Sequence, residues 1–177
     1  MKVTIDETLD RAGTGAFQRH LLGVFGLVWA ADAMQVLAVG FTVVSISKEF
    51  GLSIPGALQT GTLFFLSMLI GAALFGRLAD RHGRRKVLLF TVCCDAVFGI
   101  LSAAAPDFTS LLVLRFLTGM AVGGTLPVDY AMMAEFLPAK SRGRWLVMLE
   151  GFWAVGTVVI GAGVALMKVG IKSGVGE

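Results

Sequence analysis

Ionisable side chains interrupt the long apolar runs of this 177-residue sequence. A charge near the centre of a lipid bilayer costs about 2.5–3.5 kcal/mol or more, so such residues are candidates for moving protons or holding a charged ligand. Their types suit that chemistry, since four carry a carboxyl group and one carries a guanidinium group that can stabilise a carboxylate. The five positions are Asp32, Asp95, Arg115, Asp129 and Glu150.

The spacing of these residues limits which of them can meet. Arg115 and Asp129 are 14 positions apart, which on one helix places them within about 40° of one face and roughly 21 Å apart along the axis. The two residues lie on the same face of the helix but are too far apart to be in contact. Asp129 and Glu150 fit either the lining of a cavity or side chains that reach for the membrane surface. Asp95 fits a structural role.

The composition excludes most other classes of protein. Hydrophobic residues make up 56% of the chain and charged residues 15%, against roughly 25% charged residues in an ordinary soluble domain. The mean hydropathy is +0.82. Because 12 acidic and 15 basic residues are too few to cover a soluble domain of this length, we expect an integral membrane protein. The net charge of +3 is expected to anchor loops at the membrane, with no nucleic-acid partner.

Five segments are long and apolar enough to form transmembrane helices, which need about 20 mostly apolar residues. They are too long, and alternate too little, to be barrel strands. We expect a cytoplasmic N-terminal segment at 1–20 and a short tail at 168–177, where the chain reads as stopping early. The expected spans are about 21–46, 55–79, 87–105, 108–136 and 145–167.

Glycines recur at helical spacing in the fourth and fifth spans. Small residues let helix backbones approach closely in lipid, so we expect these positions to serve packing. They are Gly119, Gly123, Gly151, Gly156 and Gly161.

The positions of the basic residues predict the orientation. Of the 15 Lys and Arg residues, eleven lie in the N-terminal segment and in the loops that follow the second and fourth spans. Three lie on the opposite side, and Arg115 lies inside the fourth span. Because cytoplasmic loops carry an excess of Lys and Arg, we expect a cytoplasmic N-terminus in a plasma (inner) membrane.

The loop between the second and third spans, residues 76–86, reads GRLADRHGRRK. This resembles the signature loop G-x-x-x-D-R-x-G-R-R of the major facilitator superfamily. Gly83 suits a tight turn that needs positive φ, and Gly76 omits a side chain where another helix can approach. The residues that match the motif are Gly76, Asp80, Arg81, Gly83, Arg84 and Arg85.

The resemblance implies an all-α membrane protein, namely five helices of the family's N-terminal bundle, with the C-terminal half of the carrier missing. It also implies that the loop cluster is a cytoplasmic gate. Glu135 and Arg142, at the spacing E-x6-R, resemble the matching element after the fourth span. On this reading Glu135 pairs with Arg84 or Arg85, and Arg142 with Asp80; the alternative is ordinary charges at the membrane surface.

A narrower resemblance, to metabolite:proton symporters, rests on the first span around residues 31–34 and on the start of the fifth around 148–153. This branch includes bacterial niacin transporters and relatives of organic-ion transporters. It often has a second acid three residues after the first, where this sequence has Gln35. In the family the first and fourth helices line the cavity, so the resemblance favours an Asp32–Arg115 pair there. That pair is either a proton-coupling device or a static ion pair, and Trp153 either stacks on a flat solute or packs.

The predicted function is secondary transport of a small organic solute, an organic acid or a similar metabolite, by proton-coupled symport with alternating access. The alternatives are a non-transporting fragment or membrane scaffold, and a small oligomeric carrier. The expected partners are the lipid bilayer, the solute, the proton and the other half of the carrier. The sequence has no nucleotide-binding loop, metal-ligand spacing or nucleophile–base set, so we expect no enzyme activity, cofactor or metal.

Overall fold

The computed structural model describes residues 13–174, with the side chains of residues 13–167. Five helical units in this part are long and apolar enough to cross a membrane, and the same residues contain no strand. The expected all-α fold with five membrane helices is therefore confirmed for the described residues. In chain order the helices are α2 (Ala16–Glu49), the short α3 (Ile54–Ala57) with α4 (Gln59–His82), α5 (Arg84–Ala103), α6 (Phe108–Glu135) and α7 (Arg142–Gly174).

Polar side chains satisfy the free backbone groups where helices begin. The N–H of Gly15 donates to the side chain of Gln18 at 2.9 Å at the start of α2. Asp107 precedes α6 and accepts a hydrogen bond from the N–H of Ser110 at 2.9 Å. Such caps pair amide groups that have no partner within the helix, so α2 and α6 begin at defined residues.

Two details differ from the expected ranges. The second span is divided into α3 and α4 at Leu58, but this residue keeps helical dihedral angles (φ −64°, ψ −17°), so the pair still forms one crossing unit. Helix α7 continues to Gly174, beyond the expected end of the fifth span at residue 167. No proline follows Met167 to end the helix.

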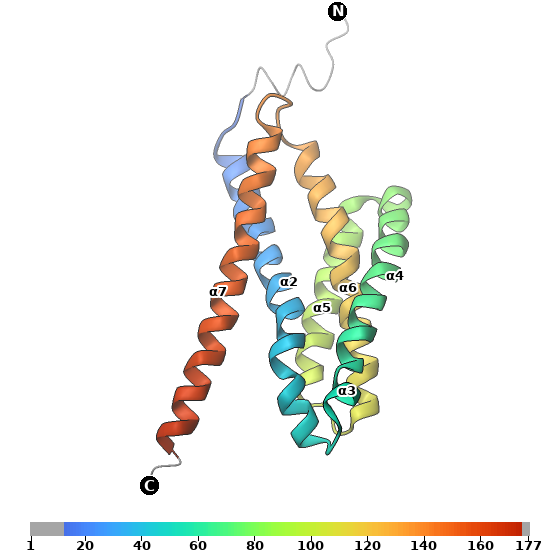
Figure 1. Ribbon diagram of the computed structural model, residues 1–177. Coiled ribbons are helices and arrows are strands. Elements are labelled where there is room, and N and C mark those ends of the chain that lie inside the picture. The colour runs from blue at the N-terminus through green and yellow to red at the C-terminus, as the bar shows by residue number, and fades with distance from the viewer. Residues whose placement is uncertain (1–12, 175–177) are drawn as a thin grey trace, which may run out of the picture.

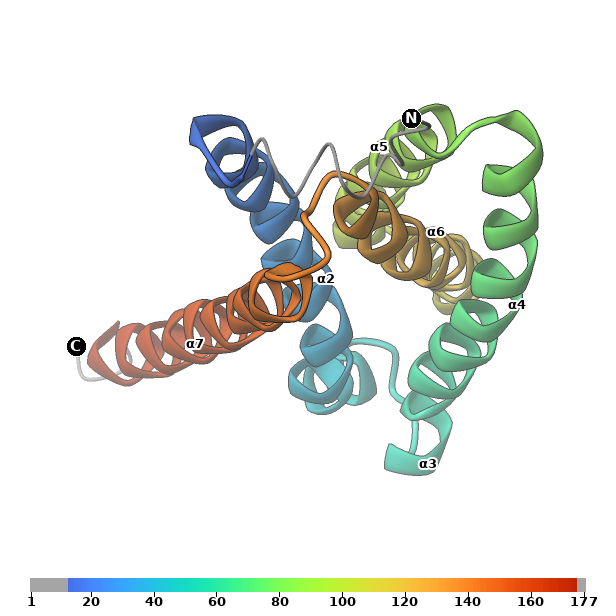
Figure 2. The same cartoon turned by 90° about the horizontal axis from the view of Figure 1, so that it is seen from above.

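The helices form two groups. Helix α6 lies between α4 and α5 and packs closely against both, while α7 packs along α2 and barely touches α6 (Figure 1). Seen from above, α7 lies on the side of α2 that is away from α4 (Figure 2). The start of α2, the α4–α5 junction and the α6–α7 loop lie at one end of the bundle, called the N-terminal end below (Figure 1).

Glycine allows the closest helix contacts within each group. A Cβ atom at Gly119 or Gly123 of α6 would collide with the backbone of α4, and one at Gly156 of α7 would collide with the backbone of α2. The expected packing role is confirmed at these three positions. At Gly151 and Gly161 an added Cβ would meet nothing within 4 Å among the described residues, so the expectation stays a prediction there.

The main apolar core holds the two groups together near the N-terminal end. Phe25 of α2 is 4% exposed, and the core also includes Phe75 of α4, Met133 of α6 and Leu149 of α7. These side chains come from four helices, so they set the position along the bundle at which the buried polar residues of α2 face α5 and α6.

Candidate functional site

One face of α2 carries the polar residues that point into the bundle. Trp29, Asp32 and Gln35 are three positions apart, which keeps them on one side of a helix with 3.6 residues per turn. Trp29 is 7% exposed and Asp32 only 1% exposed, while Gln35 is half-buried. This face of α2 therefore lies against the group formed by α4, α5 and α6.

Asp32 is a buried carboxyl group without a complete set of partners. Its Oδ2 atom has no hydrogen-bond partner. Asp95 of α5 and Asp129 of α6 are close enough to repel its charge electrostatically. Three helices thus bring one carboxyl group each toward the same buried region. A charge that is removed from water is costly unless it is paired, so this region favours neutralisation of its carboxylates by protons or cations.

Arg115 does not pair with Asp32, and the sequence-based expectation of that ion pair is wrong for this structure. Both residues are described, and no ion pair joins them. Arg115 instead donates a hydrogen bond from Nη1 to Oε1 of Gln35 at 3.3 Å, one helical turn further along α2.

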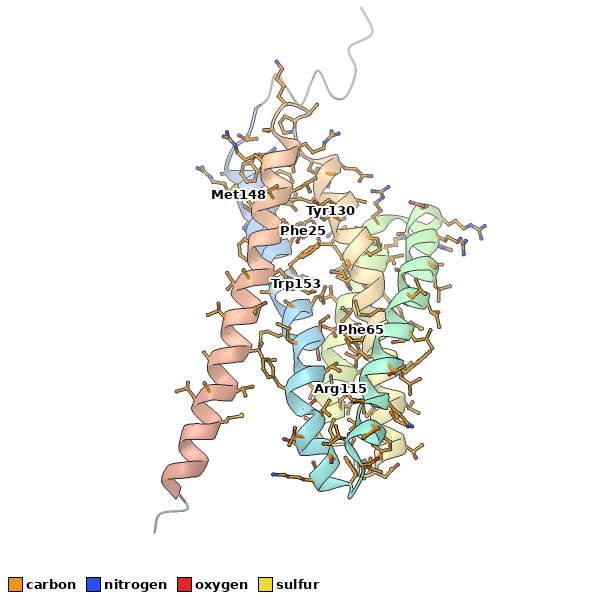
Figure 3. The ribbon with its side chains drawn as sticks, in the orientation of Figure 1. Phe25, Phe65, Arg115, Tyr130, Met148 and Trp153 are labelled. Atoms are coloured by element: carbon orange, nitrogen blue, oxygen red, sulfur yellow. The ribbon has the colours of Figure 1, made fainter. Side chains whose placement is uncertain are left out.

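An aromatic cluster lies beside Asp129 in the half of the bundle where α2 begins. The ring of Trp29 contacts Tyr130 of α6 and Trp153 of α7 at centroid distances of 5.9 and 5.8 Å. Asp129 is fully buried, and the indole N–H of Trp29 lies near its carboxyl group but outside hydrogen-bond geometry. Figure 3 shows Tyr130 and Trp153 in this half and Arg115 in the other. Trp153 therefore packs against aromatic neighbours.

Glu150, the remaining candidate on α7, is exposed. It lies only three positions from Trp153, but the structure does not bring its carboxyl group into the buried cluster. Its two readings, as cavity lining or as a residue near the membrane surface, therefore both stay open.

A cavity of about 580 Å³ opens between α2 and α5, and Ile160 of α7 also contributes to its lining. Its walls are mostly apolar, with three polar side chains: Asp32, Gln35 and Asp95. A mostly apolar cavity with a few convergent polar groups is the usual form of a site for a small molecule. The predicted residues Asp32 and Gln35 therefore lie together, and Asp95, read from the sequence as structural, joins them.

A second charged cluster lies at the N-terminal end, around Arg84. Its Nη1 lies 3.1 Å from Oε1 of Glu135, and its Nη2 lies 3.7 Å from Oδ1 of Asp80. The expected pairing of Glu135 with Arg84 is confirmed. The expected pairing of Asp80 with Arg142 is wrong, because Asp80 faces Arg84 and Arg142 donates to the backbone carbonyl of Leu137 at 3.2 Å.

Gly83 places Arg84 between the ends of three helices. It is the one residue between α4 and α5, with φ +92°, a conformation that glycine adopts without steric cost. The expected turn is confirmed. Arg81 and Arg85 are exposed and lie outside the ion pairs. At Gly76 a Cβ would meet nothing within 4 Å among the described residues, so the expected approach of another helix stays a prediction.

Comparisons with known proteins agree with this arrangement. The family model of the Major Facilitator Superfamily matches residues 22–171. The Organic cation/carnitine transporter 7 of Arabidopsis thaliana is 38% identical over 157 residues, which are 89% of this chain and 31% of the relative. A Bacillus subtilis protein provisionally named niacin/nicotinamide transporter NiaP is 42% identical over 139 residues, 78% of this chain and 35% of the relative.

A third relative carries a name that describes a place and not a solute. Human Synaptic vesicle glycoprotein 2A is 37% identical over 154 residues, 87% of this chain and 21% of the relative. The chain therefore spans between about a fifth and about a third of the length of the curated relatives it matches.

Proposed function

Because the chain belongs to the major facilitator superfamily, we propose that it supplies the first five helices of a secondary transporter for a small organic solute. The carrier works by alternating access, in which two groups of helices move around a site near the middle of the membrane. The remaining helices of the carrier form the other side of that site. Two of the relatives are named as transporters of small organic molecules, which supports this class of activity.

We infer that transport is coupled to protons. The observation that carries this inference is Asp32, a carboxyl group that is 1% exposed, lacks a partner for Oδ2 and lines the cavity between α2 and α5. Three buried carboxyl groups share the region with a single guanidinium group, so ionisation of all three would leave excess negative charge in a medium of low dielectric constant. Protons taken up from one side and released to the other relieve that excess.

The chemistry of the site supports an organic acid or a similar metabolite as the solute. Arg115 provides a guanidinium group, which binds carboxylates in a planar, two-pronged geometry. The cavity beside Gln35, which accepts the hydrogen bond from Arg115, has mostly apolar walls. A small molecule with one anionic group and one apolar part matches both features.

The Arg84 cluster is proposed to act as a gate. Its ion pairs join the last turn of α4, the start of α5 and the end of α6, so they hold three helix ends together while the carrier is closed at this end. Basic residues gather at the same end of the bundle, which supports a cytoplasmic N-terminus in a plasma membrane.

The test is uptake of a radiolabelled organic acid by proteoliposomes that contain a full-length carrier with these helices. We expect accumulation when a pH gradient is imposed and exchange without net accumulation when it is removed. Accumulation that ignores the gradient would contradict proton coupling, and a carrier that moves no solute under either condition would contradict transport.

A non-transporting membrane scaffold is the second candidate. It is favoured by α7, whose apolar residues away from α2 are exposed, for example Val147, Val158 and Leu166 at 71%, 69% and 72%. Such a surface suits contact with other membrane helices. The full-length carrier separates the candidates, because only a transporter shows gradient-driven uptake, whereas we expect no uptake from this chain alone under either candidate.

A further inference from the structure

Gln35 separates Arg115 from the cavity between α2 and α5. Among the described residues, Gln35 lines this cavity of about 580 Å³ and Arg115 does not. The Nη1 atom of Arg115 donates to Oε1 of Gln35 at 3.3 Å, so the guanidinium group lies directly behind the amide. A molecule that enters the cavity therefore meets Gln35 first and Arg115 behind it.

Arg115 has no anionic partner at this position. Asp32 and Asp95 line the same cavity, but no ion pair joins either of them to Arg115 within the described residues. Arg115 is half-buried, and its one hydrogen bond in the described part of the chain is the bond to Gln35. A guanidinium group carries several N–H donors whose arrangement matches a carboxylate. Arg115 therefore keeps donors that an anion can use.

The hydrogen bond between Arg115 and Gln35 is weak for a charged donor. Hydrogen bonds from a guanidinium group to a carboxylate are about 2.7–2.9 Å long and roughly twice as strong as bonds between neutral groups. The observed distance of 3.3 Å is longer, and the amide oxygen of Gln35 carries no charge. A carboxylate also accepts two parallel hydrogen bonds from one guanidinium group. A carboxylate that reaches Arg115 is therefore the stronger acceptor.

The packing around Gln35 leaves its side chain one direction in which to move. The Nε2 atom lies against Gly99 of α5, at the point where a Cβ would collide, so α5 leaves no space on that side. The neighbours of Gln35 on the same face of α2 are Ala31 and Ala38, which line the cavity with methyl groups only. The cavity can therefore accept the amide when it turns away from Arg115.

We propose that Gln35 occupies the anion-binding position of Arg115 while the carrier is empty, and that the carboxylate of the solute displaces it. Gln35 then determines specificity, because a carboxylate replaces the lost hydrogen bond with stronger ones and a neutral solute does not. The inference rests on the proposed function, in which protons neutralise the acids of the cavity and the solute is an organic acid.

The experiment uses this chain in lipid nanodiscs and measures how far benzoate raises the midpoint of thermal unfolding, with ionic strength kept constant by sodium chloride. A ligand that binds only the folded state raises this midpoint. Benzamide, the neutral analogue of benzoate, shows what the ring alone contributes. We expect the wild type to respond far more to benzoate than to benzamide, and Arg115→Gln to respond equally little to both.

Gln35→Met is the decisive variant, because it removes the acceptor and keeps nearly the same side-chain length. Its midpoint without ligand should fall, since a donor of Arg115 loses its partner. Benzoate should nevertheless bind about tenfold more tightly, because it no longer has to displace a hydrogen bond. Gln59→Met is the matched control at an exposed position of α4 and should respond as the wild type does. Unchanged or weaker binding of benzoate by Gln35→Met would overturn the proposal.

Gln35→Glu tests the displacement from the opposite direction and does not depend on good folding of Gln35→Met. Its carboxylate should bind Arg115 permanently, so the midpoint without ligand should rise and the response to benzoate should be lost. Adding Arg115→Gln should remove the gain in midpoint. Because Gln35→Met adds no charge, the two variants together separate displacement from simple repulsion of benzoate.

Two further outcomes would contradict the displacement of Gln35. One is a full response of Gln35→Glu to benzoate, and the other is the absence of any response in both the wild type and Gln35→Met. A full-length carrier that takes up no organic acid would contradict the proposed function and would leave these binding results unchanged.

Discussion

Arg115 and Gln35, which lie 80 positions apart in the sequence, are joined by a hydrogen bond of 3.3 Å from the guanidinium group to the amide oxygen. This bond links α6, the central helix of one group, to α2 of the other. It takes the place of the ion pair that the sequence favoured between Arg115 and Asp32. The charged side chain of Arg115 is thus bound across the two groups of helices by a neutral side chain, that of Gln35.

Replacement of Gln35 by leucine should destabilise the protein. The change removes the acceptor and leaves a buried donor of Arg115 without a partner, which typically costs about 1–3 kcal/mol. The midpoint of thermal unfolding in nanodiscs measures the effect. Gln59→Leu is the control, because Gln59 is exposed at the start of α4. Equal effects of the two variants would contradict a specific role for the bond.

Replacement of Asp32 by asparagine should abolish uptake driven by a pH gradient in a full-length carrier. If this carboxyl group carries the proton, exchange of solute without a gradient should survive better than net uptake. Because the structure gives Asp32 no cationic partner, the thermal unfolding midpoint should not fall. Accumulation and counterflow are measured side by side, and full gradient-driven accumulation by the variant would remove Asp32 from the coupling mechanism.

Replacement of Glu135 by glutamine should affect the cycle more than stability. The ion pair with Arg84 is partly exposed, with exposed side-chain fractions of 31% for Arg84 and 54% for Glu135, and exposed pairs contribute about 0–1 kcal/mol. We expect slower turnover with nearly unchanged affinity. Asp80→Asn should have a smaller effect of the same kind, since Asp80 lies 3.7 Å from Arg84. A large loss of affinity with normal turnover would contradict the gate assignment.

Replacement of Gly123 by alanine should separate α6 from α4. The added methyl group would collide with the backbone at Met68, and overpacking of this kind costs about 1–3 kcal/mol. Gly151→Ala on α7 is the matched control, because nothing lies within 4 Å of its added Cβ. It should be neutral or stabilising by up to about 1 kcal/mol, since alanine is the better helix former. The midpoint of thermal unfolding should therefore fall for Gly123→Ala and should rise or stay unchanged for Gly151→Ala.

Replacement of Asp107 by asparagine should remove a pH-dependent part of the stability. The hydroxyl and the N–H of Ser110 donate to Asp107 at 2.6 and 2.9 Å, and these hydrogen bonds hold the pKa of the carboxyl group below its ordinary value. Because the folded-state pKa is the lower one, the stabilisation is present above the unfolded-state pKa and is lost as the pH falls through the folded-state pKa. Unfolding midpoints of wild type and Asp107→Asn across acidic pH measure the difference, which should narrow toward low pH.

Several features of the fold follow from local sequence. The five helices are encoded by long apolar runs, which lipid requires to be helical. The turn at Gly83 follows from the loop motif of residues 76–86. The pairing of Arg84 with Glu135 follows from the same motif together with the matching element after the fourth span. These sequence signals lie within one segment or at helix ends that meet at the same end of the bundle.

The buried site was predicted only in part. Asp32 and Arg115 were recognised because charges in apolar runs are conspicuous, but the partner of each depends on how α2, α5 and α6 are rotated against one another. That rotation is decided by contacts such as those of Gly119 and Gly123 on α4 and of Gly99 on Gln35. The sequence alone does not mark Asp95 as part of the site, because α5 carries no second residue of obvious function to mark its inner face.

The single residue between α4 and α5 leaves no slack in the chain at that point. A displacement of the start of α5 must be followed by the end of α4, so the two helix ends stay together at Gly83. Residues inserted at this junction would uncouple the two helix ends even if both helices stayed folded and Arg84 kept its partners. The connection of 136–141 between α6 and α7 is longer, with six residues, and its exposed residues Ala139 and Lys140 are suitable positions for a reporter group that follows the motion.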